Sequence, residues 1–145
     1  MQKTFEEHGD YLLSVTSNIL TIRASGAWNK EKSLAYSADC KKLINQQFTD
    51  DYFLVLLITQ DWLPTHDSIE ILQEVTHWSL KRGLRAEAFC FSNMLEAEVI
   101  TKMITPHISD HFYRESFDDE ASALEWLTSI IDSDTQDRNS KSAQM

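Results

Sequence analysis

Two segments near the beginning of the chain show the alternation of apolar and polar side chains that is typical of β-strands. In the second of them, residues 19–25, Leu20, Ile22 and Ala24 alternate with polar side chains. This two-residue period predicts a strand with one buried face and one face in water. A similar run over residues 11–17 precedes it across a short polar turn. The two runs are therefore predicted to form an antiparallel hairpin.

An amphipathic helix and a fully apolar strand are predicted next. Tyr36, Cys40 and Ile44 recur at four-residue spacing, which places them on one face of a helix that begins after the capping residue Asn29. Residues 52–58 are apolar without alternation. A short run of this kind, bounded by polar segments, is typical of a strand buried on both faces in the centre of a parallel sheet.

The remainder of the chain continues to alternate helices and strands. A loop over residues 59–66 is predicted to precede a helix that begins at Asp67 and stops at Gly83. Further elements are predicted in this order: a strand over residues 86–91, a helix that begins at Asn93 and carries Leu95, Val99 and Met103, an edge strand over residues 111–117, and a last helix that begins at Asp118 and Asp119 and carries Leu124, Leu127 and Ile131.

The resulting order, β-β-α-β-α-β-α-β-α, predicts a single α/β domain over residues 4–131. Its sheet is expected to be five-stranded and mostly parallel, with an N-terminal β-hairpin and four helices. Residues 132–145 contain few apolar side chains. Burial in this segment could not offset the entropy of ordering it, so a disordered polar tail is predicted there.

Charge and composition narrow the classes of partner. The chain of 145 residues has a formal net charge of −10, which argues against nucleic-acid binding and against docking on an anionic membrane surface. The apolar run at residues 53–58 is too short to cross a membrane, and the first ten residues are polar and acidic, unlike a signal peptide. We therefore expect a cytoplasmic protein in which Cys40 and Cys90 are reduced, buried thiols.

No sequence motif predicts a catalytic site. The chain contains no phosphate-binding glycine loop, no nucleophile elbow and no Cys-x-x-Cys pair. His66, Glu70 and His77 could share a helical face, but their spacing is looser than that of zinc ligands. The carboxylates of Asp67 and Glu70 are explained by their position at a helix start. We expect no enzymatic activity, no metal and no cofactor.

The segment after the buried strand is the strongest candidate for a binding surface. Open α/β sheets place their sites at the carboxyl ends of central strands. Trp62 lies in this segment, where it either folds over the edge of the core or contacts a partner. The residues selected as a partner-binding surface or phosphorylation switch are Asp61, Trp62, Leu63, His66, Asp67 and Ser68.

The element order across residues 4–131 resembles the STAS fold of bacterial anti-anti-sigma factors and SpoIIAA-like proteins. Residues 63–72 resemble the family segment in which Asp-Ser-Ser-Gly opens a helix, and residues 117–127 resemble the acidic, alanine-containing last helix that ends in Trp-Leu. Only Asp67-Ser68 of the first motif is present, because Ile69 and Glu70 stand where the second serine and the glycine would be.

The resemblance implies a non-enzymatic regulatory or protein-interaction module in bacterial signalling. In family members that are switched by phosphorylation, a partner kinase modifies a hydroxyl at this helix start, so the resemblance implies that role for Ser68 and a kinase or regulator as partner. A small-molecule or lipid-binding carrier is the alternative, with Trp62, Met94 and Met103 lining an apolar pocket. Homodimerisation is also left open.

Overall fold

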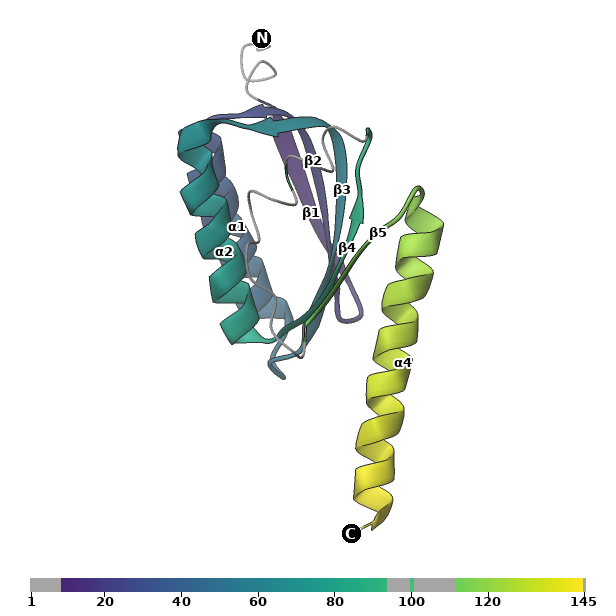
Figure 1. The fold of residues 1–145 in the computed structure, drawn as a ribbon. Coiled ribbons are helices and arrows are strands. Elements are labelled where there is room, and N and C mark those ends of the chain that lie inside the picture. Colours follow the sequence, from purple (N-terminus) through teal and green to yellow (C-terminus); the bar gives the residue numbers. More distant parts are fainter. Residues whose placement is uncertain (1–8, 94–99, 101–111, 145) are drawn as a thin grey trace.

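The computed structural model describes residues 9–93, 100 and 112–144. In chain order the elements are β1 (Asp10–Thr16), β2 (Ile19–Trp28), α1 (Lys30–Gln47), β3 (Phe53–Pro64), the short 3-10 helix η2 (His66–Ser68), α2 (Ile69–Arg82), β4 (Leu84–Cys90), β5 (Tyr113–Ser116) and α4 (Glu120–Gln144). They form one sheet with helices on both of its faces (Figure 1).

The five strands lie in the order in which they occur along the chain, β1-β2-β3-β4-β5. β1 and β2 are antiparallel, whereas each of the three later pairings is parallel. The predicted N-terminal hairpin is present, and Ser17 takes a positive φ of 56° in its turn. Because this turn reverses the chain, the sheet is mixed. The prediction of a mostly parallel sheet is therefore corrected to a mixed one.

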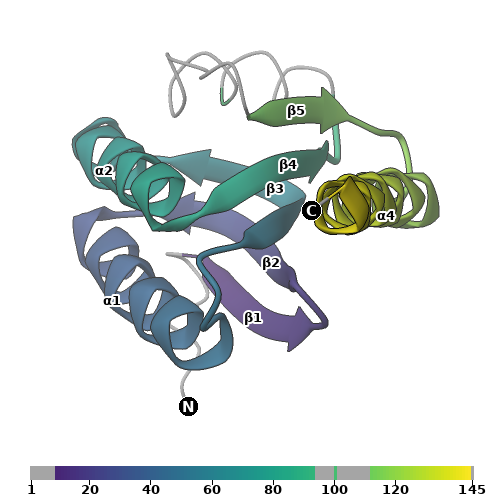
Figure 2. The same cartoon turned by 90° about the horizontal axis from the view of Figure 1, so that it is seen from below.

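The described residues contain three α-helices in place of the four predicted. α1 and α2 lie side by side on one face of the sheet, and α4 lies on the other (Figure 2). The helix predicted to begin at Asn93, with Leu95, Val99 and Met103 on its apolar face, falls outside the described residues beyond Asn93 itself. Within the described segments, no helix is long and apolar enough to cross a membrane.

The core has two layers, divided by the sheet. Along β3, Phe53, Val55 and Leu57 pack with side chains of α1 and α2, whereas Leu54 and Leu56 pack with those of α4. Both sets are buried. Successive side chains of a strand point to opposite faces, so the unbroken apolar run of this segment is explained by helices covering both sides.

Two predicted helix boundaries are confirmed by their capping contacts. The Asn29 side chain accepts a hydrogen bond from the Lys32 backbone N–H at 2.8 Å, as expected for a residue that caps a helix start. Gly83 follows α2 with φ of 125°, and its N–H donates to the Ser79 carbonyl oxygen. A Cβ at this position would lie 2.1 Å from the Asp51 carbonyl oxygen, so both the backbone conformation and the space require glycine.

The segment expected to be a loop over residues 59–66 is strand for most of its length. β3 continues to Pro64 because β2 extends to Trp28 beside it, pairing Ala27 with Leu63 and Trp28 with Pro64. The register shifts between Ser25 and Ala27 in β2, which is the signature of a β-bulge. Asp61 has a positive φ of 50° in the same stretch.

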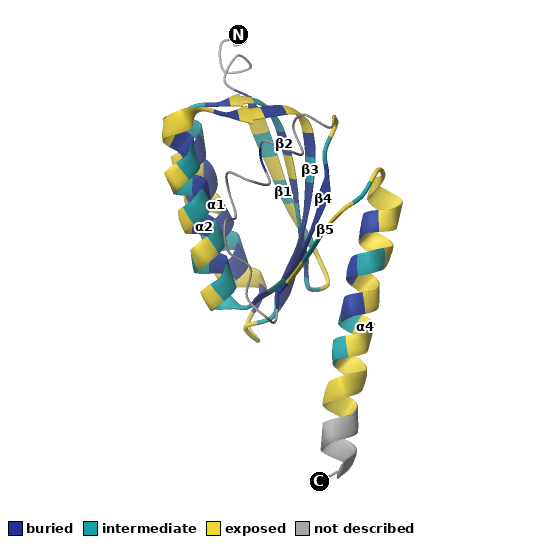
Figure 3. Cartoon of the chain, viewed as in Figure 1, coloured by how far each residue is buried: buried dark blue, intermediate teal, exposed yellow. Residues whose placement is uncertain are grey.

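The chain end also differs from its prediction. A disordered polar tail is predicted over residues 132–145, but α4 runs to Gln144, so the predicted domain boundary at 131 lies inside a helix. Asp134 accepts hydrogen bonds from Arg85 at 2.9 and 3.0 Å and from the Tyr52 hydroxyl at 2.6 Å. Arg138 lies over the Tyr52 ring, 5.2 Å from its centroid. Figure 3 colours most of the described residues in this part of α4 as exposed. Polar contacts, rather than apolar burial, therefore hold it to the sheet.

Candidate functional site

The end of β3 and the following η2 bring together the six residues selected from the sequence, but only four of them reach the surface. Asp61, Leu63, His66 and Asp67 are exposed, as is the intervening Thr65. We call these five residues the β3–η2 surface. Leu63 is the large apolar side chain among them, with 54% of its area exposed. The surface lies at the carboxyl end of a central parallel strand, where open α/β sheets place their sites.

Trp62 belongs to the core and not to this surface. It is 2% exposed, and its ring lies edge-on against Trp28, with 5.0 Å between ring centroids and 74° between planes. Because residues 61–63 are in a strand, their side chains alternate, and Trp62 points inward between outward-pointing neighbours. Of the two roles left open for Trp62, the structure supports the one at the core edge.

Ser68 is also enclosed. Its side chain has no exposed area. Its hydroxyl donates to the carbonyl oxygen of Trp28 at 3.2 Å and lies 3.1 Å from Thr65 Oγ1. The same Trp28 oxygen accepts the Thr65 backbone N–H at 2.8 Å. The hydroxyl therefore ties η2 to the end of β2, and a kinase could reach it only after η2 had separated from that strand.

Thr65 is the residue of this segment that sequence reasoning missed. It precedes η2, is exposed, and donates from its hydroxyl to Asp67 Oδ1 at 2.6 Å. The sequence offered a weak signal, because threonine is a favoured residue immediately before a helix start, although the Thr65 side chain caps no backbone N–H here. Thr65 therefore carries a hydroxyl that a modifying enzyme can reach without unfolding the segment.

A buried ion pair forms a second polar cluster, on β4 and β5. Arg114 donates to one oxygen of Glu87 from Nε at 3.1 Å and from Nη2 at 2.6 Å, and the guanidinium lies between the rings of Phe89 and Phe112. Burial raises the pKa of Glu87, whereas the charge and hydrogen bonds of Arg114 lower it. We assign this pair to the core, because its carboxylate is engaged by the arginine and its side chains are 11% and 6% exposed.

The cavities differ greatly in size and place. The one between the sheet and helices α1 and α2 is lined by Trp28, Trp62 and Glu87 and has a volume of about 40 Å³, far below the ~300 Å³ at which ligand pockets begin. A groove of about 640 Å³ lies between β2 and α4, over Ile19 and Leu124. Met94 and Met103, expected to line a pocket with Trp62, fall outside the described residues. Within the described segments, no three His, Cys, Asp or Glu side chains converge on a metal-sized site.

Ser68→Asp is expected to lower the free energy of unfolding by about 2–4 kcal/mol, because it places a charge in an enclosed site and removes a hydroxyl donor. Thr65→Glu, three residues away on the surface, is expected to cost less than about 1 kcal/mol. Urea denaturation followed by circular dichroism measures both. A Ser68→Asp variant as stable as the wild type would show that the pocket opens readily, and would restore Ser68 as an accessible switch.

Comparison with known proteins agrees with this architecture. No family model and no curated protein matches the chain. Among solved structures, it is similar to an uncharacterized protein of the DUF3478 family with a SpoIIAA-like fold from Shewanella loihica PV-4, with a TM-score of 0.58 and 15% sequence identity. The match covers 82% of this chain and 94% of that one. The chain therefore has a STAS/SpoIIAA-like fold, as its element order had indicated.

Proposed function

We propose that this SpoIIAA-like domain is a non-enzymatic regulatory module that binds a protein partner through the β3–η2 surface. The observation that carries the proposal is Leu63, a large apolar side chain 54% exposed on a strand, with exposed aspartates at positions 61 and 67 of the same segment. An apolar anchor with charges at its rim is the usual composition of a small protein interface.

The surface is well suited to binding because its backbone is already held in place. Two hydrogen bonds fix η2 on the Trp28 carbonyl oxygen, one from the Thr65 N–H and one from the Ser68 hydroxyl. A surface ordered before binding loses little entropy when a partner docks. Its two carboxylates favour a partner that presents a basic patch next to an apolar pocket.

A switch at this surface would use Thr65 in place of Ser68. A phosphoryl group on Thr65 would add about two negative charges beside the Asp67 carboxylate, to which the hydroxyl now donates at 2.6 Å. The modification would break that hydrogen bond and strengthen the negative charge of the surface. A kinase or another regulator, the kind of partner implied by the resemblance to anti-anti-sigma factors, fits such an arrangement.

Leu63→Asp is expected to weaken partner binding at least tenfold, because it replaces the apolar anchor with a third carboxylate. The partner is first isolated with the wild-type protein as bait, then purified, and its affinity for each variant is measured by titration calorimetry. The matched control is Leu124→Asp, the same change at a leucine 46% exposed on α4.

Circular dichroism is expected to show that both variants are folded, because both side chains are exposed. If Leu63→Asp binds as tightly as the wild type, the partner docks elsewhere and the β3–η2 surface is not the site. If both variants lose binding equally, the effect is one of charge and does not support an anchor at Leu63.

A further inference from the structure

Within the described residues, β1 contains no lysine, proline or bulge of the kind that protects an edge strand from pairing with another strand. β1 is the first strand of the sheet order, so within the described part of the chain no strand lies on its outer side. Edge strands are commonly protected by short length, lysine, proline or a bulge. β1 has seven residues, DYLLSVT, in unbroken register with β2, and its charged side chain is Asp10 at the first position.

The opposite edge of the sheet contrasts with β1. β5 has four residues, and two of them, Arg114 and Glu115, are charged. Its length and charge make β5 a poor template for another strand. The difference between the two edges indicates that the exposed β1 edge is suited to pairing.

The outward-facing backbone groups of β1 can be identified from one hydrogen bond. The Tyr11 N–H donates to the Asp10 side chain at 2.8 Å, which places this N–H on the outer side of the strand. Because the hydrogen-bonding direction alternates along an antiparallel strand, the groups of Leu13 and Val15 face the same outer side. Leu13 and Val15 thus each present a donor and an acceptor along the edge, and Tyr11 presents its carbonyl oxygen. The Tyr11 N–H becomes a third donor when it exchanges the Asp10 carboxylate for a neighbouring strand.

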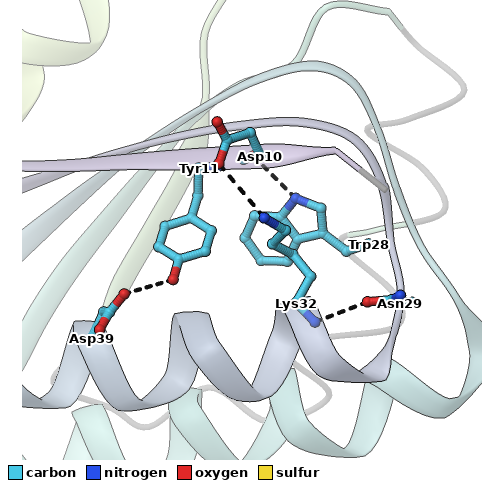
Figure 4. A network of polar contacts seen from close by, with 6 residues as sticks. All are labelled: Asp10, Tyr11, Trp28, Asn29, Lys32 and Asp39. Carbon is cyan, nitrogen blue, oxygen red and sulfur yellow. Dashed lines mark hydrogen bonds and ion pairs between the residues drawn. The ribbon is translucent and has the colours of Figure 1, made fainter. Parts of the chain in front are cut away.

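β1 is also fastened on the side that faces α1. The Tyr11 hydroxyl donates to Asp39 at 2.6 Å, the Lys32 ammonium lies 3.7 Å from Asp10, and the Trp28 indole N–H donates to the Asp10 carbonyl oxygen at 3.1 Å. Figure 4 shows these side chains converging below the strand. The edge is therefore held in the extended conformation that strand pairing requires.

We propose that two copies of the chain pair through their β1 strands, antiparallel and with the two-fold axis at Leu13, to form one continuous sheet. In this register Tyr11 of one copy lies opposite Val15 of the other, Leu12 opposite Ser14, and Asp10 opposite Thr16. Each outward N–H and carbonyl named above then meets its complement. Leu12, 64% exposed on the strand, is covered by the second copy.

The charge pattern supports a second copy as the occupant. Two chains of net charge −10 repel one another in general, but within β1 itself the charged side chain is Asp10, which lies at the two ends of the seam. They lie about 20 Å apart, at about 3.4 Å for each of six residue steps. This separation exceeds the Debye length of about 8 Å at physiological salt. A symmetric seam with an uncharged centre lets two acidic chains approach each other without placing carboxylates face to face.

Leu12→Lys tests the seam. In the proposed register the two Leu12 side chains are diagonal neighbours, about 7–8 Å apart, so the variant brings two ammonium groups together and introduces the common edge-protecting residue. We expect the dimer dissociation constant, measured by sedimentation up to ~200 μM, to rise at least tenfold. The variant reduces the net negative charge from −10 to −9, so a loss of pairing cannot come from added repulsion between the two chains as a whole.

The matched control is Leu124→Lys, the same substitution at an exposed leucine of α4, which should dimerise as the wild type does. A wild-type protein that is monomeric over the whole concentration range would overturn the proposal. So would a dimer that Leu12→Lys leaves unchanged, because its interface would lie elsewhere. Leu63→Asp should not alter the dimer, so failure of this proposal and failure of the proposed function can be told apart.

A cysteine pair tests the register itself. Residues 12 and 14 of opposite copies form non-hydrogen-bonded pairs, whose Cα atoms lie about 4.5 Å apart, within the disulfide range. Mild oxidation of Leu12→Cys/Ser14→Cys should therefore yield a covalent dimer, while Cys40 and Cys90 stay buried. Leu12→Cys/Thr16→Cys places no such pair opposite and should remain uncrosslinked. Equal crosslinking of both variants would contradict the proposed two-fold position.

Discussion

Arg114→Met is expected to lower the free energy of unfolding by about 3–5 kcal/mol, because it leaves the buried carboxylate of Glu87 without its partner. The two side chains are 6% and 11% exposed, and their shortest contact is 2.6 Å. Methionine retains much of the apolar contact of the arginine stem with Phe89 and Phe112 but supplies neither charge nor hydrogen bond. Urea denaturation measures the loss.

The matched control is the double variant Glu87→Met/Arg114→Met. Replacement of both members of a buried ion pair by apolar residues is often neutral, since the desolvation cost of both charges disappears. We expect the double variant to recover most of the stability lost in Arg114→Met. A double variant less stable than the single one would mean that packing, and not the unpaired charge, causes the loss.

The same variant should acquire a dependence on pH. In Arg114→Met, burial still raises the pKa of Glu87, and the arginine that lowers it is gone. In the folded variant Glu87 then keeps its proton at a pH where the unfolded chain has released it. The folded variant is therefore most stable below the ordinary pKa of glutamate, and it loses stability as the pH rises through the raised pKa of Glu87 in the folded state. The deficit against wild type should be smaller at about pH 5 than at about pH 8, and Glu87→Gln/Arg114→Met should not show this trend.

Trp62→Ala is expected to cost about 3–5 kcal/mol, the usual range for deleting a large buried aromatic side chain. Trp62 is 2% exposed, contacts the Trp28 ring, and borders the cavity of about 40 Å³, which its removal would enlarge. Leu63→Ala, at the adjacent position, should change stability by less than about 1 kcal/mol because its side chain lies outside.

Thermal and urea denaturation of the two variants provide the comparison. A large difference between the two variants would show that residues 62 and 63 lie in a strand and not in a loop. In a strand, successive side chains point to opposite faces, so one of two neighbours is buried and the other is exposed. If the two variants lost similar stability, the inward placement of Trp62 would be wrong, and Trp62 would again be a candidate for direct contact with a partner.

The early strands and helix boundaries could be predicted because their signals are local. The alternation of Leu20, Ile22 and Ala24, the cap at Asn29 and the stop at Gly83 each depend on a few neighbouring residues. Residues 59–66 are predicted as a loop from the sequence alone, and Gln60 and Asp61 interrupt the apolar run at that point. The strand conformation of this segment depends on β2 extending beside it, information that lies more than thirty residues earlier.

The end of α4 was mispredicted for a similar reason. Residues from 132 onwards contain few apolar side chains. Asp134 nevertheless bonds to Arg85 and Tyr52, which are 49 and 82 positions away in the chain. Burial counts over a window cannot detect such pairs. Glu87 was a signal that could have been used, since a glutamate within an apolar strand indicates a buried partner of opposite charge.

At the candidate site, the sequence located the segment but not which side chains face out. Asp61, Trp62 and Leu63 alternate polar, aromatic and aliphatic, which fits either a strand or a loop. The enclosure of Ser68 depends on the Trp28 carbonyl oxygen, which is 40 positions away. Exposure at helix starts is thus decided by packing between elements, which a single sequence does not display.

Trp28 supports both proposed interfaces at once. Its carbonyl oxygen receives η2 through Thr65 and Ser68, and its indole N–H holds the Asp10 carbonyl at the start of β1. If partner binding at the β3–η2 surface changed the affinity of β1 for a second copy, the effect could pass through this one residue. Pairing of β1 would then change the affinity for the partner by the same factor. A substitution of Trp28 would remove the indole N–H that holds β1 but would keep the carbonyl oxygen that receives η2. The two interfaces are therefore best separated by variants at Leu12 and Leu63.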